Sequence, residues 1–262
     1  MAFFTKDPFL GTLGLTDPIA TRAGLNAPFC QVVRGEDPAL GAGEFVFAQV
    51  TGTNVAGQSI TSITTVNGIA TLTAGGAHGL QPGAIVILAG QTPSAYSGTW
   101  TVATVPSTTT FTFVHGNTTL GATTVQGTYT VGLIQPGQLC ALTWTMVGGA
   151  PVATVAPYAG TANTGIPLGV ALIGLTVGQF GWIQVQGVSI VLTAGAPAAN
   201  GAVYTGTSGA ITPTAAAGKQ IIGATYVSAV SQVVGAGSTA VTLTSTQALV
   251  YLNRPAAQSQ IT

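Results

Sequence analysis

Short strand-like runs constrain the fold of this chain more than any other feature. They are rich in Val, Ile, Thr and aromatic residues, clusters of Gly, Pro, Asn and Ser separate them, and helical periodicity is nearly absent. Such residues suit a pleated strand, so the pattern predicts an all-β protein with many short strands. The dipeptide Asn67-Gly68 between two runs predicts a tight hairpin. The runs are GEFVFAQV (43–50), IATLTA (69–74), AIVILAG (84–90), TWTVATV (99–105), TFTFVHG (110–116), GWIQVQG (181–187) and AVTLTST (240–246).

The first 40 residues differ from the rest in their prolines. Four prolines spaced by ten residues leave little room for a helix or a long strand. We predict an extended N-terminal arm over residues 1–40 that lies on a partner, with a flexible tail as the alternative. The prolines are Pro8, Pro18, Pro28 and Pro38.

Composition divides the remaining chain. Residues 57–130 are dense in Thr, Ser and Gly and read as a self-contained β-module. Exposed loop tips tolerate inserted domains, so we predict that this module is inserted into a scaffold. The scaffold is then a discontinuous β-sandwich or barrel-like domain made of residues 41–56 and 131–255, and residues 256–262 are a C-terminal tail.

The segment GQFGWIQVQG (178–187) raises the choice between a ligand pocket and a wall of the β-structure. Strand alternation places Trp182 and the two glutamines, 184 and 186, on one face. The apolar positions change parity after Gly187, which predicts a bulge or strand corner. We favour the wall: Trp182 covers a core edge, and the Gln184 and Gln186 amides face solvent or a neighbouring subunit. The predicted scaffold core comprises Phe45, Phe47, Trp144, Trp182, Ile183, Val185 and Tyr204.

Charge is scarce and unevenly placed. Charged residues make up 4% of the 262 residues, the formal net charge is zero, and residues 45–218 carry none. Nucleic-acid binding and a polybasic membrane anchor both need clustered Lys and Arg, so neither is expected. A neutral surface rich in Thr and Gly favours a protein that works in an assembly over an isolated monomer. The predicted partner contacts are the charged side chains of the arm: Lys6, Asp7, Asp17, Arg22, Arg34, Glu36 and Asp37.

The residues that could carry chemistry are few. His78 and His115 have no Cys or carboxylate nearby in the sequence, so we predict turn or strand-end residues rather than metal ligands. Cys30 and Cys140 are expected to be buried thiols rather than a disulfide. No membrane-spanning segment and no export signal are expected. We therefore predict a protein that is not an enzyme and has no catalytic site, metal or cofactor.

Several short motifs in the scaffold, taken in order, resemble the head-decoration (capsid cement) proteins of tailed bacteriophages. They include GEFVFAQV, the GQLC turn, LGVA, GQFGWIQ and GAVY. The inserted module is similar to small immunoglobulin-like modules of phage virion proteins, through VNGIATLTAGGAHGLQPG and YSGTWTVATVPSTTTFTF. The scaffold segments that carry the resemblance are Glu44–Val50, Gly137–Cys140, Leu168–Ala171, Gly178–Gln184, Gly201–Tyr204 and Ile222–Gly223.

This resemblance implies a structural role in the virion. The protein would bind the outer surface of an icosahedral head and stabilise it against internal DNA pressure. Its partners would be the major capsid protein and other copies of itself, after synthesis in the host cytoplasm. A tail or fibre component that contacts the host surface is the first alternative. A hydrolase or lyase on a β-scaffold is the alternative from another class.

Overall fold

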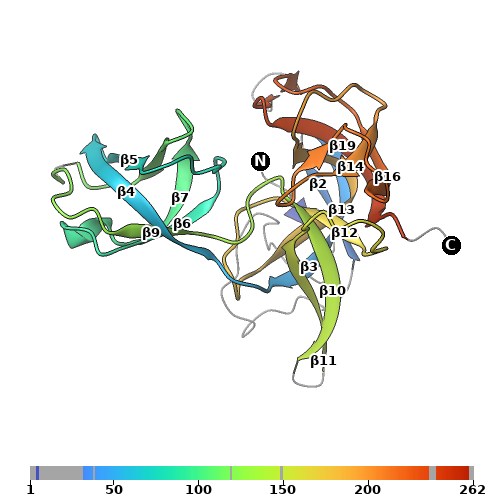
Figure 1. Ribbon diagram of the computed structural model, residues 1–262, viewed down its shortest axis with the longest axis horizontal. Helices are drawn as coiled ribbons and strands as arrows, with labels where there is room; N and C mark the ends of the chain where they lie inside the picture. The colour runs from blue at the N-terminus through green and yellow to red at the C-terminus, as the bar shows by residue number, and fades with distance from the viewer. Residues whose placement is uncertain are drawn as a thin grey trace. The chain divides into compact units, whose positions relative to one another are not determined.

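The chain folds almost entirely into β-strands in a computed structural model, which confirms the predicted all-β class. The chain splits into two compact units (Figure 1). The scaffold unit takes the chain up to Thr51, Gly137–Leu172 and the chain from Gly178, and the barrel unit takes Gly52–Pro136 and Ile173–Val177. No helix of the described residues is long and apolar enough to cross a membrane. The structure describes residues 4–5, 32–37, 39–118, 120–147, 150–235 and 240–259.

Six antiparallel strands of the barrel unit close on themselves in the order β4-β5-β8-β7-β6-β9. The closure depends on the long strand β4, which pairs with β9 along its first part and with β5 along its second. An immunoglobulin-like module has two separate sheets packed face to face, so this closed barrel differs from that expectation. The strands are β4 (Val55–Val66), β5 (Ile69–Ala74), β6 (Ile85–Ala89), β7 (Gly98–Thr104), β8 (Thr110–Val114) and β9 (Thr128–Val131), and η1 (Ser94–Tyr96) is a short 3-10 turn.

The barrel is filled by aromatic and aliphatic side chains and faced by hydroxyl groups. Phe111, Phe113 and Tyr129 are fully or almost fully buried in its core. The exposed hydroxyls of Thr104 and Thr112 form a hydrogen bond of 2.7 Å between β7 and β8. Alternation of inward apolar and outward polar residues is what a half-buried strand requires. Threonine hydroxyls therefore supply polar groups on the surface of this unit, which has no charged side chains.

The predicted hairpin at Asn67-Gly68 is confirmed. It joins β4 to β5, whose last and first residues, Val66 and Ile69, are register partners. Asn67 and Gly68 both have positive φ angles, 50° and 77°. A two-residue hairpin of this type needs positive φ at both central positions, which Asn and Gly tolerate best.

One large sheet makes up most of the scaffold unit. Its order is β1-β2-β3-β11-β10-β12-β13-β19-β16-β14-β15, and a further pairing of β3 with β13 closes β3, β11, β10, β12 and β13 into a ring. The described strands are β1 (Phe4–Thr5), β2 (Val32–Asp37), β3 (Gly41–Val50), β10 (Leu139–Val147), β11 (Ala150–Pro157), β12 (Leu168–Ala171), β13 (Phe180–Leu192), β14 (Ala202–Thr205), β15 (Ile211–Thr212), β16 (Gln220–Tyr226) and β19 (Gln247–Ala257). The run predicted at 240–246 yields only β18 (Val241–Thr242), which pairs with β17 (Val233–Val234).

Strand β2 corrects the predicted arm. Val32–Asp37 pair with β3 in antiparallel register, from Val32 opposite Val46 to Asp37 opposite Gly41. These residues are therefore part of the scaffold sheet rather than an arm over residues 1–40. The alternation of buried and exposed residues along β2 provides the reason, since it is the pattern of a strand with one face toward a core, in which Val33 packs with Phe47 and Trp182. Apart from β1, the rest of the predicted arm before Val32 lies outside the described residues.

The wall interpretation of residues 178–187 is confirmed at Trp182, which is completely buried in β13. Its ring lies 4.9 Å from that of Phe47, centroid to centroid, and Val33 of β2 joins the same cluster. The register against β3 shifts between Gln184 and Gln186, next to Gly187 at φ +99°, which confirms the predicted bulge.

The predicted exposure of Gln184 is wrong. Its side chain is 1% exposed, and its Nε2 donates to the backbone carbonyls of Gln186 and Val188 at 3.1 and 3.0 Å. The face that carries Trp182 and Gln184 is covered by other strands rather than by solvent. The amide therefore satisfies the bulged backbone of its own strand. A sequence pattern of alternating polar residues cannot distinguish such a buried amide from an exposed one.

Five of the seven predicted core residues are buried, and two are not. Phe45, Phe47, Trp182, Ile183 and Val185 are confirmed. The prediction for Trp144 is wrong, because its side chain is 51% exposed. The prediction for Tyr204 is also wrong, since β14 buries its neighbours Val203 and Thr205 and turns the half-buried Tyr204 to the opposite face.

Trp144 is exposed because its hairpin extends past its neighbours. Strand β10 pairs with β12 only over residues 139–141, and β11 pairs with β3 only at Thr154 and Val155. Beyond those points, among the residues that the structure describes, β10 and β11 pair only with each other, as their projection in Figure 1 shows. Met146, on the same face of β10 as Trp144, is 68% exposed.

Candidate binding surfaces

The predicted contact residues have three different fates. Lys6, Asp7, Asp17 and Arg22 lie outside the described residues. Arg34 and Glu36 are exposed on β2. Asp37 is 1% exposed, and its Oδ1 accepts hydrogen bonds from the backbone N–H groups of Ala39 and Leu40 at 2.7 and 2.8 Å. Asp37 therefore stabilises the turn between β2 and β3, and the prediction that it contacts a partner is wrong.

Arg34 belongs to a charged cluster that the sequence did not reveal. The largely buried carboxylate of Glu44 in β3 lies 3.0 Å from Arg254 Nη2 and 3.6 Å from Arg34 Nε. Gln186 adds a contact, because its amide nitrogen, in the orientation that satisfies both ends of the amide, donates to Glu44 at 2.7 Å. We call Arg34, Glu44, Gln186 and Arg254 the Glu44 cluster.

Charge and shape both leave the Glu44 cluster able to bind further groups. The side chains of Arg34 and Arg254 are 84% and 68% exposed, whereas that of Glu44 is 12% exposed. Two guanidinium groups on one carboxylate leave a net positive charge. A cavity of about 260 Å³ lies beside them and is also lined by Tyr251. Guanidinium groups bind carboxylates with paired hydrogen bonds, so an acidic side chain of a partner suits this place.

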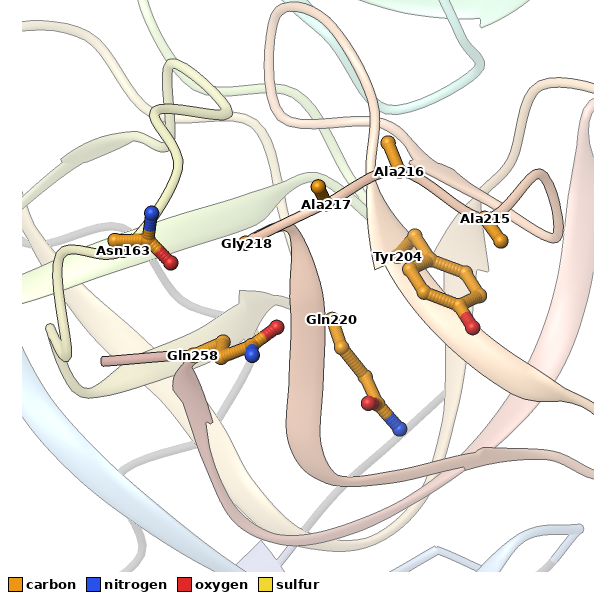
Figure 2. A pocket seen from close by; sticks show the side chains of 8 residues that line it. All are labelled: Asn163, Tyr204, Ala215, Ala216, Ala217, Gly218, Gln220 and Gln258. Atoms are coloured by element: carbon orange, nitrogen blue, oxygen red, sulfur yellow. The ribbon is translucent and has the colours of Figure 1, made fainter. Parts of the chain in front are cut away.

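A second hollow of the scaffold unit has no charge at all. Its volume is about 670 Å³, and none of its eight lining residues is ionised at neutral pH (Figure 2). It lies where β14, β16 and the end of β19 meet two loops. The lining residues are Asn163, Tyr204, Ala215, Ala216, Ala217, Gly218, Gln220 and Gln258. We call it the amide pocket.

The amide pocket could not be predicted from the sequence, because its lining residues come from four separate places in the chain. The strand run around Tyr204 predicts a core position for it, and single Asn and Gln residues carry no signal in a chain rich in polar uncharged residues. The strand register brings them together: Tyr204 is the register partner of Gln220. No spacing along the sequence predicts that pairing.

The histidines and the described cysteine occupy the predicted kinds of position. His78 lies in the loop after β5, where its Nδ1 accepts from Leu80 N–H, and His115 directly follows β8. Cys140 is fully buried, and burial raises the pKa of its thiol well above the ordinary value. Cys30 lies outside the described residues. Within the described ranges, no three His, Cys, Asp or Glu side chains are grouped to hold a metal ion.

Comparison with known proteins adds no relative. No protein-family model, no curated protein and no solved structure matches the chain.

Proposed function

We propose that this chain is a structural virion protein that binds the outer surface of an icosahedral phage head and stabilises the capsid. The observation that carries the proposal is the location of the six segments that resemble head-decoration proteins. All six lie in the scaffold unit, on β3, β10, β12, β13, β14 and β16 or the turns that lead into them. The resemblance therefore covers one compact folded body rather than scattered matches.

The surface chemistry suits a permanent assembly. The barrel unit contains no charged residue. Isolated soluble proteins generally rely on surface charge to resist association. Exposed Trp144 and Met146 add apolar side chains of the kind enriched at the centres of protein interfaces. The major capsid protein and further copies of this chain are the proposed partners.

The Glu44 cluster is the proposed contact on the described part of the scaffold. It is built from β2, β3, β13 and β19, and β2 follows the N-terminal segment whose charges are predicted to contact the head. Charged groups at such a contact set orientation and association rate more than affinity. The cluster would then contact an acidic region of the capsid protein.

Co-sedimentation with undecorated heads tests this proposal. The intact chain should sediment with the heads, and a variant lacking residues 1–31 should bind at least about tenfold more weakly through loss of interface contacts. The deletion ends before Val32 because β2 belongs to the scaffold sheet. The double variant Arg34→Glu and Arg254→Glu should also bind weakly, whereas Lys219→Glu, outside the cluster, is the matched control. Immunogold labelling of whole particles should mark the head.

Each result decides a separate point. Equal occupancy for the intact and truncated chains would move the contact away from the N-terminal segment. Normal binding by the double arginine variant would remove the Glu44 cluster from the interface. Failure of the intact chain to bind heads, together with gold label on tails, would replace the proposal with the tail or fibre alternative.

A further inference from the structure

The amide pocket has a volume typical of a small-molecule site. Its volume of about 670 Å³ lies within the range of about 300–1,000 Å³ that ligand pockets occupy. It belongs to the scaffold unit alone, so it needs no other part of the chain to form. Figure 2 shows the ring of Tyr204 and the amides of Gln220, Gln258 and Asn163 among the side chains that line it.

Strand register places three of these side chains in a row. Tyr204 on β14 is the partner of Gln220 on β16. Ile221 pairs with Ala257, so the next residues, Gln220 and Gln258, are opposite each other, and Gln258 N–H donates to the Gln220 carbonyl at 2.9 Å. Neighbouring strands are about 4.8 Å apart, so the row presents polar groups at regular steps beside one aromatic ring.

Backbone hydrogen bonds hold the rim of the pocket in place. Asn163 N–H donates to the Gly218 carbonyl at 2.9 Å, and Lys219 N–H donates to the Ala216 carbonyl at 3.1 Å. Gly218 has φ +71°, and a Cβ at this position would lie 2.4 Å from Asn163 Oδ1. A side chain here would be strained by the positive φ and would push the Asn163 amide aside. A pocket fixed in this way needs little ordering when a ligand binds.

The polar groups of the row are free to bind a ligand. Within the described residues, the side chains of Tyr204, Gln220 and Gln258 make no hydrogen bond to the protein. Each amide both donates and accepts, and so does the tyrosine hydroxyl. The flat apolar face of the Tyr204 ring provides a stacking surface next to them. The three exposed alanines of the rim, 215–217, leave room above the row.

These features select the chemistry of the ligand. An ionised ligand would need a countercharge, which none of the lining residues supplies. A sugar ring has an apolar C–H face for the tyrosine and hydroxyl groups that both donate and accept for the amides. We propose that the amide pocket binds a neutral saccharide. This goes beyond head binding and does not depend on it, because the two sites use different residues.

Glycan binding by the full chain tests the inference. The chain is applied to an array of immobilised neutral and acidic bacterial polysaccharides, and neutral di- and trisaccharides are titrated in solution by calorimetry or NMR. We expect retention by at least one neutral glycan, with dissociation constants of about 1 mM to 1 μM for the free oligosaccharide. Binding only to immobilised polysaccharide would assign the site to repeated surface glycans, and binding of both forms would assign it to the sugar unit itself.

Variants connect the binding to the pocket. Tyr204→Ala should weaken saccharide binding at least about tenfold, whereas Tyr204→Phe, which keeps the ring, should lose less. Gln220→Ala should also weaken it. Tyr251→Ala is the matched control, since this exposed tyrosine of the same unit lies at the Glu44 cluster instead.

The opposite results are equally clear. Absence of any neutral glycan ligand, exclusive binding of acidic glycans, or unchanged affinity in Tyr204→Ala would overturn the saccharide site. Co-sedimentation of Tyr204→Ala with undecorated heads should remain at the level of the intact chain. Loss of head binding in this variant would instead place the pocket in the capsid interface and overturn its separate role.

Discussion

The two units of this protein differ in how far apart in the sequence their paired strands can lie. In the barrel unit, β4 pairs with β5, β6 with β7 and β7 with β8, so neighbours in sequence are often neighbours in the barrel. In the scaffold unit, β3 pairs with β13 and runs parallel to β11, more than a hundred residues away. Local pairing closes short loops, whereas distant pairing must overcome a larger loss of chain entropy.

The units also differ in how their surfaces use polar groups. The barrel unit relies on Thr and Ser hydroxyls, whereas the scaffold unit gathers Arg34, Glu44 and Arg254 into one cluster and free amides into one pocket. Strands close in sequence bring Arg34 to Glu44 and Tyr204 to Gln220. Arg254 and Gln258 join them from β19 and the residue after it. The unit with the longest-range strand pairings is therefore the one that carries both candidate binding surfaces.

The largest expected effect separates the two cores. Trp182→Ala should destabilise the scaffold unit by about 3–5 kcal/mol, because it removes a fully buried ring packed on Phe47. The barrel unit does not contain Trp182, so its unfolding transition should stay in place. Scanning calorimetry of the full chain measures both transitions. Trp144→Ala is the matched control and should change stability by less than about 0.5 kcal/mol, since its side chain is exposed. A parent-like transition for Trp182→Ala would contradict the two-core comparison.

The next effect tests the bulge that joins distant strands. A Cβ on Gly187 would lie 2.5 Å from the Ala42 carbonyl oxygen, whereas one on Gly178 meets nothing within 4 Å. Both residues have positive φ, so alanine should cost about 1–2 kcal/mol at either site from backbone strain. Gly187→Ala should cost about 1–3 kcal/mol more, from forced displacement of β3. Equal losses in urea unfolding would show that the bulge relaxes without disturbing β3.

A smaller effect is expected when the barrel is removed. Val55 and Val131 are register partners on β4 and β9, so the chain enters and leaves the barrel at adjacent points. Replacing residues 55–131 with a short Gly/Ser linker should leave the scaffold folded, with a change in its stability of less than about 1 kcal/mol. Circular dichroism and the melting transition of the shortened chain measure this. An insoluble or unfolded product would mean that the scaffold needs the barrel.

The smallest effect is on stability, because this test measures the reactivity of the Cys140 thiol and leaves the scaffold core unchanged. Only a thiolate reacts with thiol reagents, and burial raises the pKa of the Cys140 thiol. In a Cys30→Ser background, Cys140 should therefore stay unmodified by an aromatic disulfide reagent at pH 8 until the scaffold unfolds. Labelling of Cys140 should coincide with the scaffold transition and not with that of the barrel. Rapid labelling of the folded chain would reveal local opening near β10.

Part of the fold could be predicted because its signals are local. Strand runs, the Asn67-Gly68 hairpin and the parity change at Gly187 each depend on a few adjacent residues. Trp182 could be assigned to a core because a large aromatic side chain in a strand run usually packs inward. The same reasoning was wrong for Trp144, since burial there depends on where the neighbouring strands end.

The sequence alone determined the all-β class, the positions of most strands and the separation of an uncharged Thr-rich module from the rest. These follow from steric preferences of single residues and from the two-residue repeat of a strand. Only the tertiary structure decided that β2 belongs to the sheet, that Gln184 is buried, and that Tyr204 lines a pocket. Strand register decides these, because it brings together residues that are far apart in the chain, and no local pattern carries that information.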